Sequence, residues 1–280
     1  MRQLTITFLT FIILTSCSND NTSAGDNKVN QTDRLNNNFI SILNGVWVLT
    51  DYINEIEKTK SPLKSSDRLE GVVTMVIDAT FQSDSIDIGV SWNNHEGFNF
   101  MAFFESGQET TNLKTNLPDF DVKTNYFELG YEKINNKVLL ALYRYNSSDK
   151  LIDKRMFAKV SDKQNSDDAA WGLQYMVNEK LFSGDYLLLD STNNWTKVTL
   201  KSDGTITGYS GFKTYNVATD FLGGPKTILD EIFFNANERN AMLFAFIIQN
   251  DTTYLYSTIG NEEEGELLHL DKVKYKLVRQ

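Results

Sequence analysis

The chain contains little cysteine, proline or histidine. Its 280 residues include one Cys, three Pro and two His. A single Cys excludes an intramolecular disulfide and a thiolate metal cluster built from this chain alone. His95 and His269 stand in neither an HExxH nor a zinc-finger spacing, and the sequence has no GxSxG or phosphate-loop motif. We therefore expect no metal, no cofactor and no catalytic centre.

An excess of positive charge is also missing. The chain has 27 Lys and Arg against 37 Asp and Glu, a formal net charge of −10. Binding to nucleic acid phosphates requires clustered Lys and Arg, so we expect no nucleic-acid partner. Eighteen Phe and twelve Tyr, in a chain that is 41% hydrophobic, favour strands around a sizeable core.

The amino terminus lacks an apolar run long enough to cross a membrane. Arg2 precedes a short apolar run over residues 4–14, which cannot span a hydrocarbon core of ~30 Å and is typical of a signal peptide. Leu14-Thr15-Ser16-Cys17 follows and resembles the lipobox of bacterial lipoproteins. The resemblance implies a signal peptide over residues 1–16, cleavage before Cys17 and acylation of Cys17. The alternative is an ordinary signal peptide with a chance Cys.

Residues 17–37 have few large apolar side chains. Such a segment cannot bury enough surface to offset its ordering entropy, so we expect an acylated, flexible tether. Several acyl chains would hold the protein stably on a membrane. The expected location is the bacterial cell envelope, at the periplasmic or surface face of the outer membrane.

The rest of the chain alternates apolar and polar residues with a period of two. The alternation is clearest over residues 73–81, 86–92 and 98–104, and Asn135-Asn136 and Asp203-Gly204 are typical hairpin turns. The pattern predicts an all-β, antiparallel fold with two tandem barrels, over residues 38–163 and 166–280, each preceded by a short helix. The alternatives are one larger barrel or barrels filled by their own side chains.

A short pattern occurs once in each predicted unit. Gly45-Val46-Trp47 and Gly184-Asp185-Tyr186 both place a Gly two residues before a large aromatic at the start of a predicted strand. The first strand is expected over residues 46–53, followed by a loop or short helix over 54–70. The repeated pattern favours a tandem duplication of one β unit.

The Gly-x-Trp strand start, the antiparallel hairpins and a basic residue late in each unit resemble the lipocalin-like (calycin) barrels. The resemblance implies that Trp47 closes one end of the first barrel, with Arg155 packed over it. In the second unit Tyr186 takes the place of Trp47, and Arg279 the place of Arg155. The resemblance also implies a small apolar ligand inside the barrel.

Aromatic residues are the candidates for lining that ligand site, with ordinary core as the alternative. The candidates are Trp92, Phe98, Phe100, Phe104, Tyr126 and Tyr131. His95, beside Glu96, has the chemistry of a metal ligand or general base, but it lies in a polar turn where a solvated His is common.

We therefore expect a non-catalytic, lipid-anchored envelope protein whose partners are the membrane, reached through the acyl chains, and a small apolar ligand. The alternative is a structural or assembly lipoprotein that contacts other envelope proteins or glycans. A hydrolase whose site carries no recognisable motif is the third hypothesis.

Overall fold

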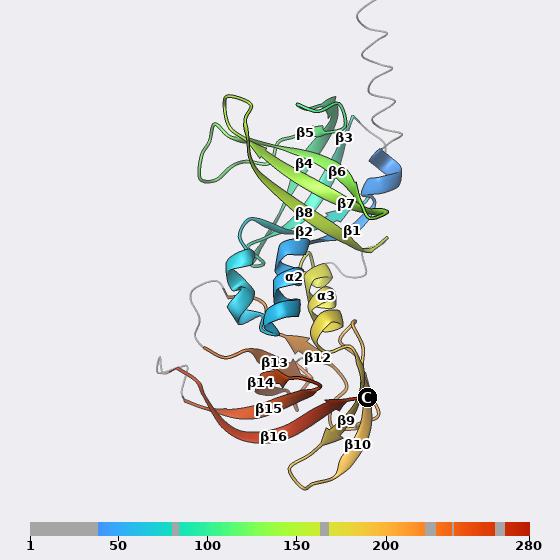
Figure 1. Ribbon diagram of the computed structural model, residues 1–280, viewed down its shortest axis with the longest axis vertical. Coiled ribbons are helices and arrows are strands. Elements are labelled where there is room, and N and C mark those ends of the chain that lie inside the picture. Colours follow the sequence, from blue (N-terminus) through green and yellow to red (C-terminus); the bar gives the residue numbers. More distant parts are fainter. Residues whose placement is uncertain (1–38, 80–83, 163–167, 222–227, 237, 261–266) are drawn as a thin grey trace, which may run out of the picture.

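The computed structural model describes residues 39–79, 84–162, 168–221, 228–236, 238–260 and 267–280. The expected signal peptide, Cys17 and the tether lie outside the described residues. The molecule has three layers along its long axis: a β-barrel, a layer of helices and a second β-sheet (Figure 1).

The first unit is a closed antiparallel barrel in which the strands follow one another in chain order. Its first strand pairs with both the second and the last, which closes the ring. This confirms the predicted antiparallel all-β fold for the first unit. The strands are β1 (Gly45–Leu49), β2 (Val72–Ile77), β3 (Ser85–Trp92), β4 (Glu96–Ser106), β5 (Leu113–Thr115), β6 (Tyr126–Ile134), β7 (Lys137–Tyr145) and β8 (Leu151–Ser161).

The second unit is an eight-stranded antiparallel sheet with the same connectivity. Its first strand again pairs with the next strand and with the last one. One isolated bridge, Thr205 to Thr214, links the segments beside its two outer strands. The strands are β9 (Gly184–Leu189), β10 (Trp195–Leu200), β11 (Ile206–Thr207), β12 (Tyr215–Val217), β13 (Glu231–Phe234), β14 (Met242–Gln249), β15 (Thr252–Ile259) and β16 (His269–Arg279).

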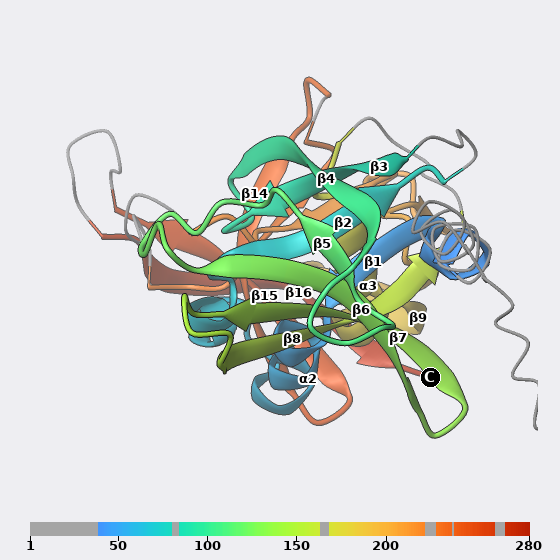
Figure 2. The same ribbon diagram turned by 90° about the horizontal axis from the view of Figure 1, so that it is seen from above.

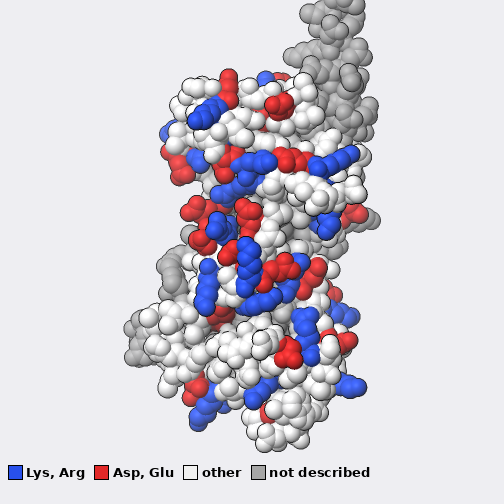
Figure 3. Space-filling view, in the orientation of Figure 1, with Lys and Arg blue, Asp and Glu red and all other residues white. Residues whose placement is uncertain are grey.

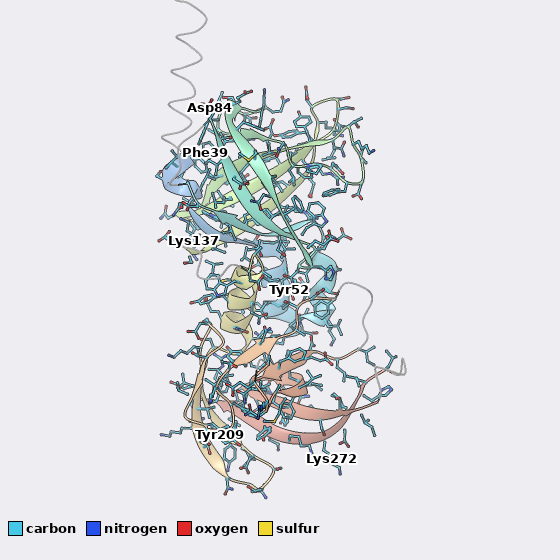
Figure 4. The ribbon with its side chains drawn as sticks, turned by 180° about the vertical axis from the view of Figure 1, so that it is seen from behind. Phe39, Tyr52, Asp84, Lys137, Tyr209 and Lys272 are labelled. Atoms are coloured by element: carbon cyan, nitrogen blue, oxygen red, sulfur yellow. The ribbon has the colours of Figure 1, made fainter. Side chains whose placement is uncertain are left out.

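A helical segment precedes the first strand of each unit, as the sequence predicted. Residues 39–43 form a helical turn before β1, and α3 (Trp171–Leu181) precedes β9. The helical turn lies at one end of the first barrel, where Figure 4 labels Phe39.

The predicted first strand over residues 46–53 is wrong in its second half. The strand ends at Leu49, and α2 (Thr50–Thr59) and a 3₁₀ helix, η1 (Leu63–Arg68), follow it. Tyr52, Ile53 and Ile56 are buried on one face of α2, with the i, i+3, i+4 spacing of an amphipathic helix. Asp51 in the first turn and Lys58 in the last match the polarity of the helix dipole.

The helical layer packs against both units. A Cβ atom on Gly172 of α3 would lie 2.5 Å from Val46 Cγ1, so the helix lies directly on the outer face of β1. The η1 backbone N–H of Leu63 donates to Asp230 Oδ1 in the second unit at 2.8 Å, and Asn94 Nδ2 donates to the Thr219 carbonyl at 2.9 Å. These contacts join the two units through buried surface as well as through the chain.

His95, from the turn between β3 and β4, belongs to this junction. Its Nδ1 lies 2.8 Å from Asp220 Oδ2 of the second unit. The hydrogen bond from the imidazole and the negative charge of Asp220 raise the His95 pKa above its ordinary value. The stabilising effect of the charged pair is therefore complete below the unfolded-state pKa of ~6.5, and it is lost as the pH rises through the higher folded-state pKa.

We expect an NMR titration of the two His side chains to give His95 a pKa above ~6.5. In Asp220→Asn, the His95 pKa should fall, because the hydrogen bond to a carboxylate and its negative charge are both removed. An unaltered His95 pKa in this variant would contradict the pairing across the two units.

Candidate functional site

The closed end of the first barrel is built around Trp47. The indole is 1% exposed, and its Nε1 donates a 2.7 Å hydrogen bond to the carbonyl of Leu43 in the preceding helical turn. Phe39 from the same turn packs edge-on against Tyr131 of β6, with 5.4 Å between the ring centroids. The backbone of Gly45 has φ +126°, and a Cβ there would lie 2.3 Å from the Ser161 carbonyl oxygen, so only Gly fits.

The second unit repeats this arrangement around Tyr186. Gly184 also has a positive φ, +147°. The Arg279 guanidinium lies over the buried Tyr186 ring at 5.3 Å, and Arg279 Nη2 donates to the Tyr186 hydroxyl at 2.8 Å. Arg279 is therefore held on Tyr186 by both a cation–π contact and a hydrogen bond.

The corresponding cation in the first unit is Lys159, and the expected position of Arg155 over Trp47 is wrong. Lys159 Nζ lies 5.1 Å from the centre of the Trp47 ring. In the strand register Lys159 is opposite Trp47, as Arg279 is opposite Tyr186. Arg155 comes earlier in β8, towards the other end of the barrel. No local pattern in the sequence singles out Lys159, because its place opposite Trp47 follows from the pairing register of β1 and β8.

The other end of the first barrel holds a cavity of about 330 Å³, which we call the mouth. Trp92 of β3 lines it, and Phe98 of β4 packs against Trp92 with 5.8 Å between the ring centroids. Phe120, from the loop between β5 and β6, packs edge-on against Trp92 at 5.0 Å and is 61% exposed. A large apolar ring that is this exposed, beside two others, is a typical surface for stacking a ligand.

The loop that carries Phe120 is fixed to the barrel by Asp119. The Asp119 carboxylate accepts hydrogen bonds from the backbone N–H of Val122 at 3.0 Å, Asn125 Nδ2 at 2.8 Å and Arg144 Nε at 2.6 Å. Burial by itself raises the pKa of Asp119, but these hydrogen bonds outweigh burial and hold the pKa below its usual range. Asp119 is therefore ionised at neutral pH and holds the Arg144 side chain against the loop.

Arg144 and Arg155 form the basic part of the mouth lining. Arg155 donates from Nη1 to the Glu70 carbonyl and from Nε to Asp153 at 3.2 Å. Within the described part of the chain, neither Arg144 Nη1 nor Arg155 Nη2 has a hydrogen-bond partner. Each guanidinium therefore keeps a donor for an acceptor group on a ligand.

The predicted aromatic residues do not form one site. Trp92 lines the mouth and Phe98 packs against it, while Phe100 and Phe104 are buried in the barrel and Tyr131 lies at the closed end. Tyr126 is on the outer face of β6, stacked on Tyr145, so its predicted place in the lining is wrong. The β6 alternation places Phe127, not Tyr126, towards the mouth.

The interior of the first barrel is packed with its own side chains. The inward-facing residues of β3 and β4 are buried. Ile88 and Phe100, which are paired across these strands, are fully or almost fully buried. The other buried interior residues include Trp47, Met75, Ile77, Ile86, Val90, Ala102, Phe104, Leu113, Leu129, Leu140, Leu142 and Phe157. The mouth is therefore a cavity at the end of a filled barrel.

The described residues contain no group of three or more His, Cys, Asp or Glu side chains placed to hold a metal ion. Over the same residues, no helix has the length and apolar character needed to cross a membrane.

Together, the fold and the site define a chain of two eight-stranded antiparallel β units, the first closed into a barrel with an aromatic and basic cavity at one end. No protein-family model matches this chain, and comparison with curated proteins and with solved structures gives no significant match.

Proposed function

We propose that this protein is a non-catalytic binding protein that holds a small ligand at the mouth of the first barrel. The supporting observation is that the exposed Phe120, the half-buried Trp92 and the guanidinium groups of Arg144 and Arg155 line one cavity. The ligand would have a flat apolar part, which stacks on Trp92 and Phe120, and a carboxylate or similar acceptor for Arg144 and Arg155. It is thus more polar than the apolar ligand that the sequence suggested.

The lipocalin-like resemblance is part of this proposal. It is supported by the Gly-x-aromatic start of each unit, by the cation over each aromatic and by the helical segment before each first strand. We place the ligand at the open end of the barrel because the opposite end is closed by Phe39 and Trp47.

Isothermal titration with 2-naphthoate, a rigid aromatic carboxylate, tests the mouth. We expect Arg155→Gln to weaken binding about tenfold, since a hydrogen bond to a charged group contributes ~1.5–3 kcal/mol. Trp92→Ala should weaken it by a similar factor, through the loss of stacking. Arg239→Gln and the exposed Trp195→Ala are the matched controls and should bind as the unchanged protein does. Equal affinities in all five proteins, or no binding at all, would contradict the proposed site.

We also propose that the protein is a lipoprotein of the bacterial outer membrane, attached through Cys17. The support is the LTSC sequence after a short apolar run. Metabolic labelling with palmitate should mark the unchanged protein, and Cys17→Ser should abolish both labelling and cleavage of the precursor. A Cys17→Ser variant that is still processed and membrane-bound would rule out this anchor.

Assembly with another envelope protein is the second candidate function. The hairpin of β15 and β16 exposes four large apolar side chains: Ile259, Leu267, Leu270 and Val273. Several exposed apolar side chains on one hairpin are typical of a surface that contacts another protein. Crosslinking in intact cells should then give an adduct that Ile259→Asp abolishes and the mouth variant Trp92→Ala leaves in place.

A further inference from the structure

A second hollow, which we call the waist groove, lies between the first barrel and the helical layer, away from the mouth. Its volume is about 720 Å³, the size of a typical small-molecule site. One wall is formed by β1, β7 and β8, and the other by α2 and α3. Lys137, at the start of β7, is labelled in Figure 4 on the side of the barrel next to the helices.

The lining of the waist groove combines an apolar surface with basic groups. Its apolar residues are Ile42, Trp47, Val48, Ile53, Val138, Leu139, Ala158, Val160 and Met176. Three Lys and one Glu also line it, on a chain whose net charge is −10. On the face that Figure 3 shows, the two signs of charge are intermixed. An anionic group on an occupant would meet ammonium groups in this lining.

The three lysines differ in how far they are already paired. Lys159 bonds Asp162 at 2.9 Å, and Lys180 bonds Glu57 at 3.0 Å. Lys137 Nζ has no ion-pair or hydrogen-bond partner among the residues that the structure describes. Lys137 is therefore the lysine that can pair with an incoming anion without giving up an existing partner.

The backbone around the groove cannot recognise a peptide strand. β7 pairs with β6 and β8, and β8 pairs with β7 and β1, so neither strand offers a free edge. Recognition in the groove must come from side chains, which present apolar surface along the walls and ammonium groups at the rim. A long alkyl chain with one terminal anion matches that distribution.

We propose that the waist groove binds one long-chain carboxylate. Its alkyl chain lies between β8 and the two helices, and its carboxylate pairs with Lys137. The ligand differs from that of the mouth, and neither site depends on the other. The groove also touches both units, since α3 leads into the second sheet, so its occupant would add to the contact between them.

Isothermal titration of the protein with dodecanoate, kept below its micellar concentration, tests the proposal. We expect one dodecanoate per chain. Ala158→Phe fills the groove from the outer face of β8 and should weaken binding by at least ~10-fold through steric exclusion. Lys137→Glu should weaken dodecanoate binding roughly fivefold and leave dodecanol binding unchanged, since only the carboxylate meets the lysine.

Lys197→Glu, which makes the same charge change on β10, is the matched control, and the mouth variant Trp92→Ala is the second; both should bind dodecanoate as the unchanged protein does. Wild-type affinity in Ala158→Phe, or equal losses in Lys137→Glu and Lys197→Glu, would overturn the proposal.

Crosslinking with a photoreactive dodecanoate tests the groove in the unchanged protein, so the result does not depend on whether a variant folds. Mass spectrometry of the crosslinked, unchanged protein should find the label on peptides from β7, β8, α2 or α3. Label confined to the mouth or to the second sheet would overturn the assignment of the groove, without affecting the 2-naphthoate result.

Discussion

Replacing Trp47 by Ala is expected to lower the free energy of unfolding by about 3–5 kcal/mol, which is the usual cost of removing a fully buried Trp. The ring is 1% exposed, and its N–H bonds the Leu43 carbonyl. The variant loses the apolar contact, this hydrogen bond and the surface beneath Lys159 at the same time. Because total stabilities are ~5–15 kcal/mol, the melting temperature should fall sharply.

Trp195→Ala is the matched control for this prediction. Trp195 is 55% exposed on β10, so its removal should change the stability by less than ~0.5 kcal/mol. Urea unfolding of both variants, followed by circular dichroism, compares them directly. Similar small losses in the free energy of unfolding of both variants would show that Trp47 does not hold the closed end of the barrel together.

Phe212→Ala should have a comparable effect in the second unit, about 3–5 kcal/mol. Phe212 stacks on Phe234 with ring centroids 4.3 Å apart, and it packs edge-on against Tyr209 and Tyr275, both at 5.1 Å. Its removal leaves these rings around a cavity that the sheet cannot collapse to fill.

Hydrogen exchange separates the two destabilised variants. Phe212→Ala should speed exchange first in β12 to β16, and Trp47→Ala first in β1 to β8. Phe120→Ala removes the same side chain from an exposed loop and should cost far less than Phe212→Ala. A Phe212→Ala protein as stable as Phe120→Ala would contradict the role of this aromatic cluster.

The sequence predicted the strands well because their signal is local. Alternation with a period of two specifies which residues face inwards without any knowledge of strand pairing, as for Ile88 and Phe100. The helix α2 was predicted only in part, since a loop or short helix was expected over residues 54–70 and α2 begins at Thr50. Its first residues continue an apolar, β-type run, so local propensity and tertiary packing disagree there. Tyr52 is fully buried, and its pKa is raised by burial and by the charge of Asp230, which is far away in the chain.

The candidate site was only partly predictable, because it depends on contacts between residues far apart in the chain. Trp92 lies on a strand and follows from the alternation. Phe120 lies in a loop, and its place at the mouth depends on the Asp119 to Arg144 contact across 25 residues. Lys159 and Arg155 both precede the end of β8, and only the strand register shows which of them faces Trp47.

The packing of Gly172 against Val46 gives the molecule a mechanical property. The helix that begins the second unit packs on the first strand of the first unit, with the backbone of Gly172 against the Val46 side chain. A pull on the amino-terminal end of the barrel is therefore passed to the second sheet through packed helices. The barrel and the second sheet should therefore respond to such a load together, as one rigid body, and not one after the other.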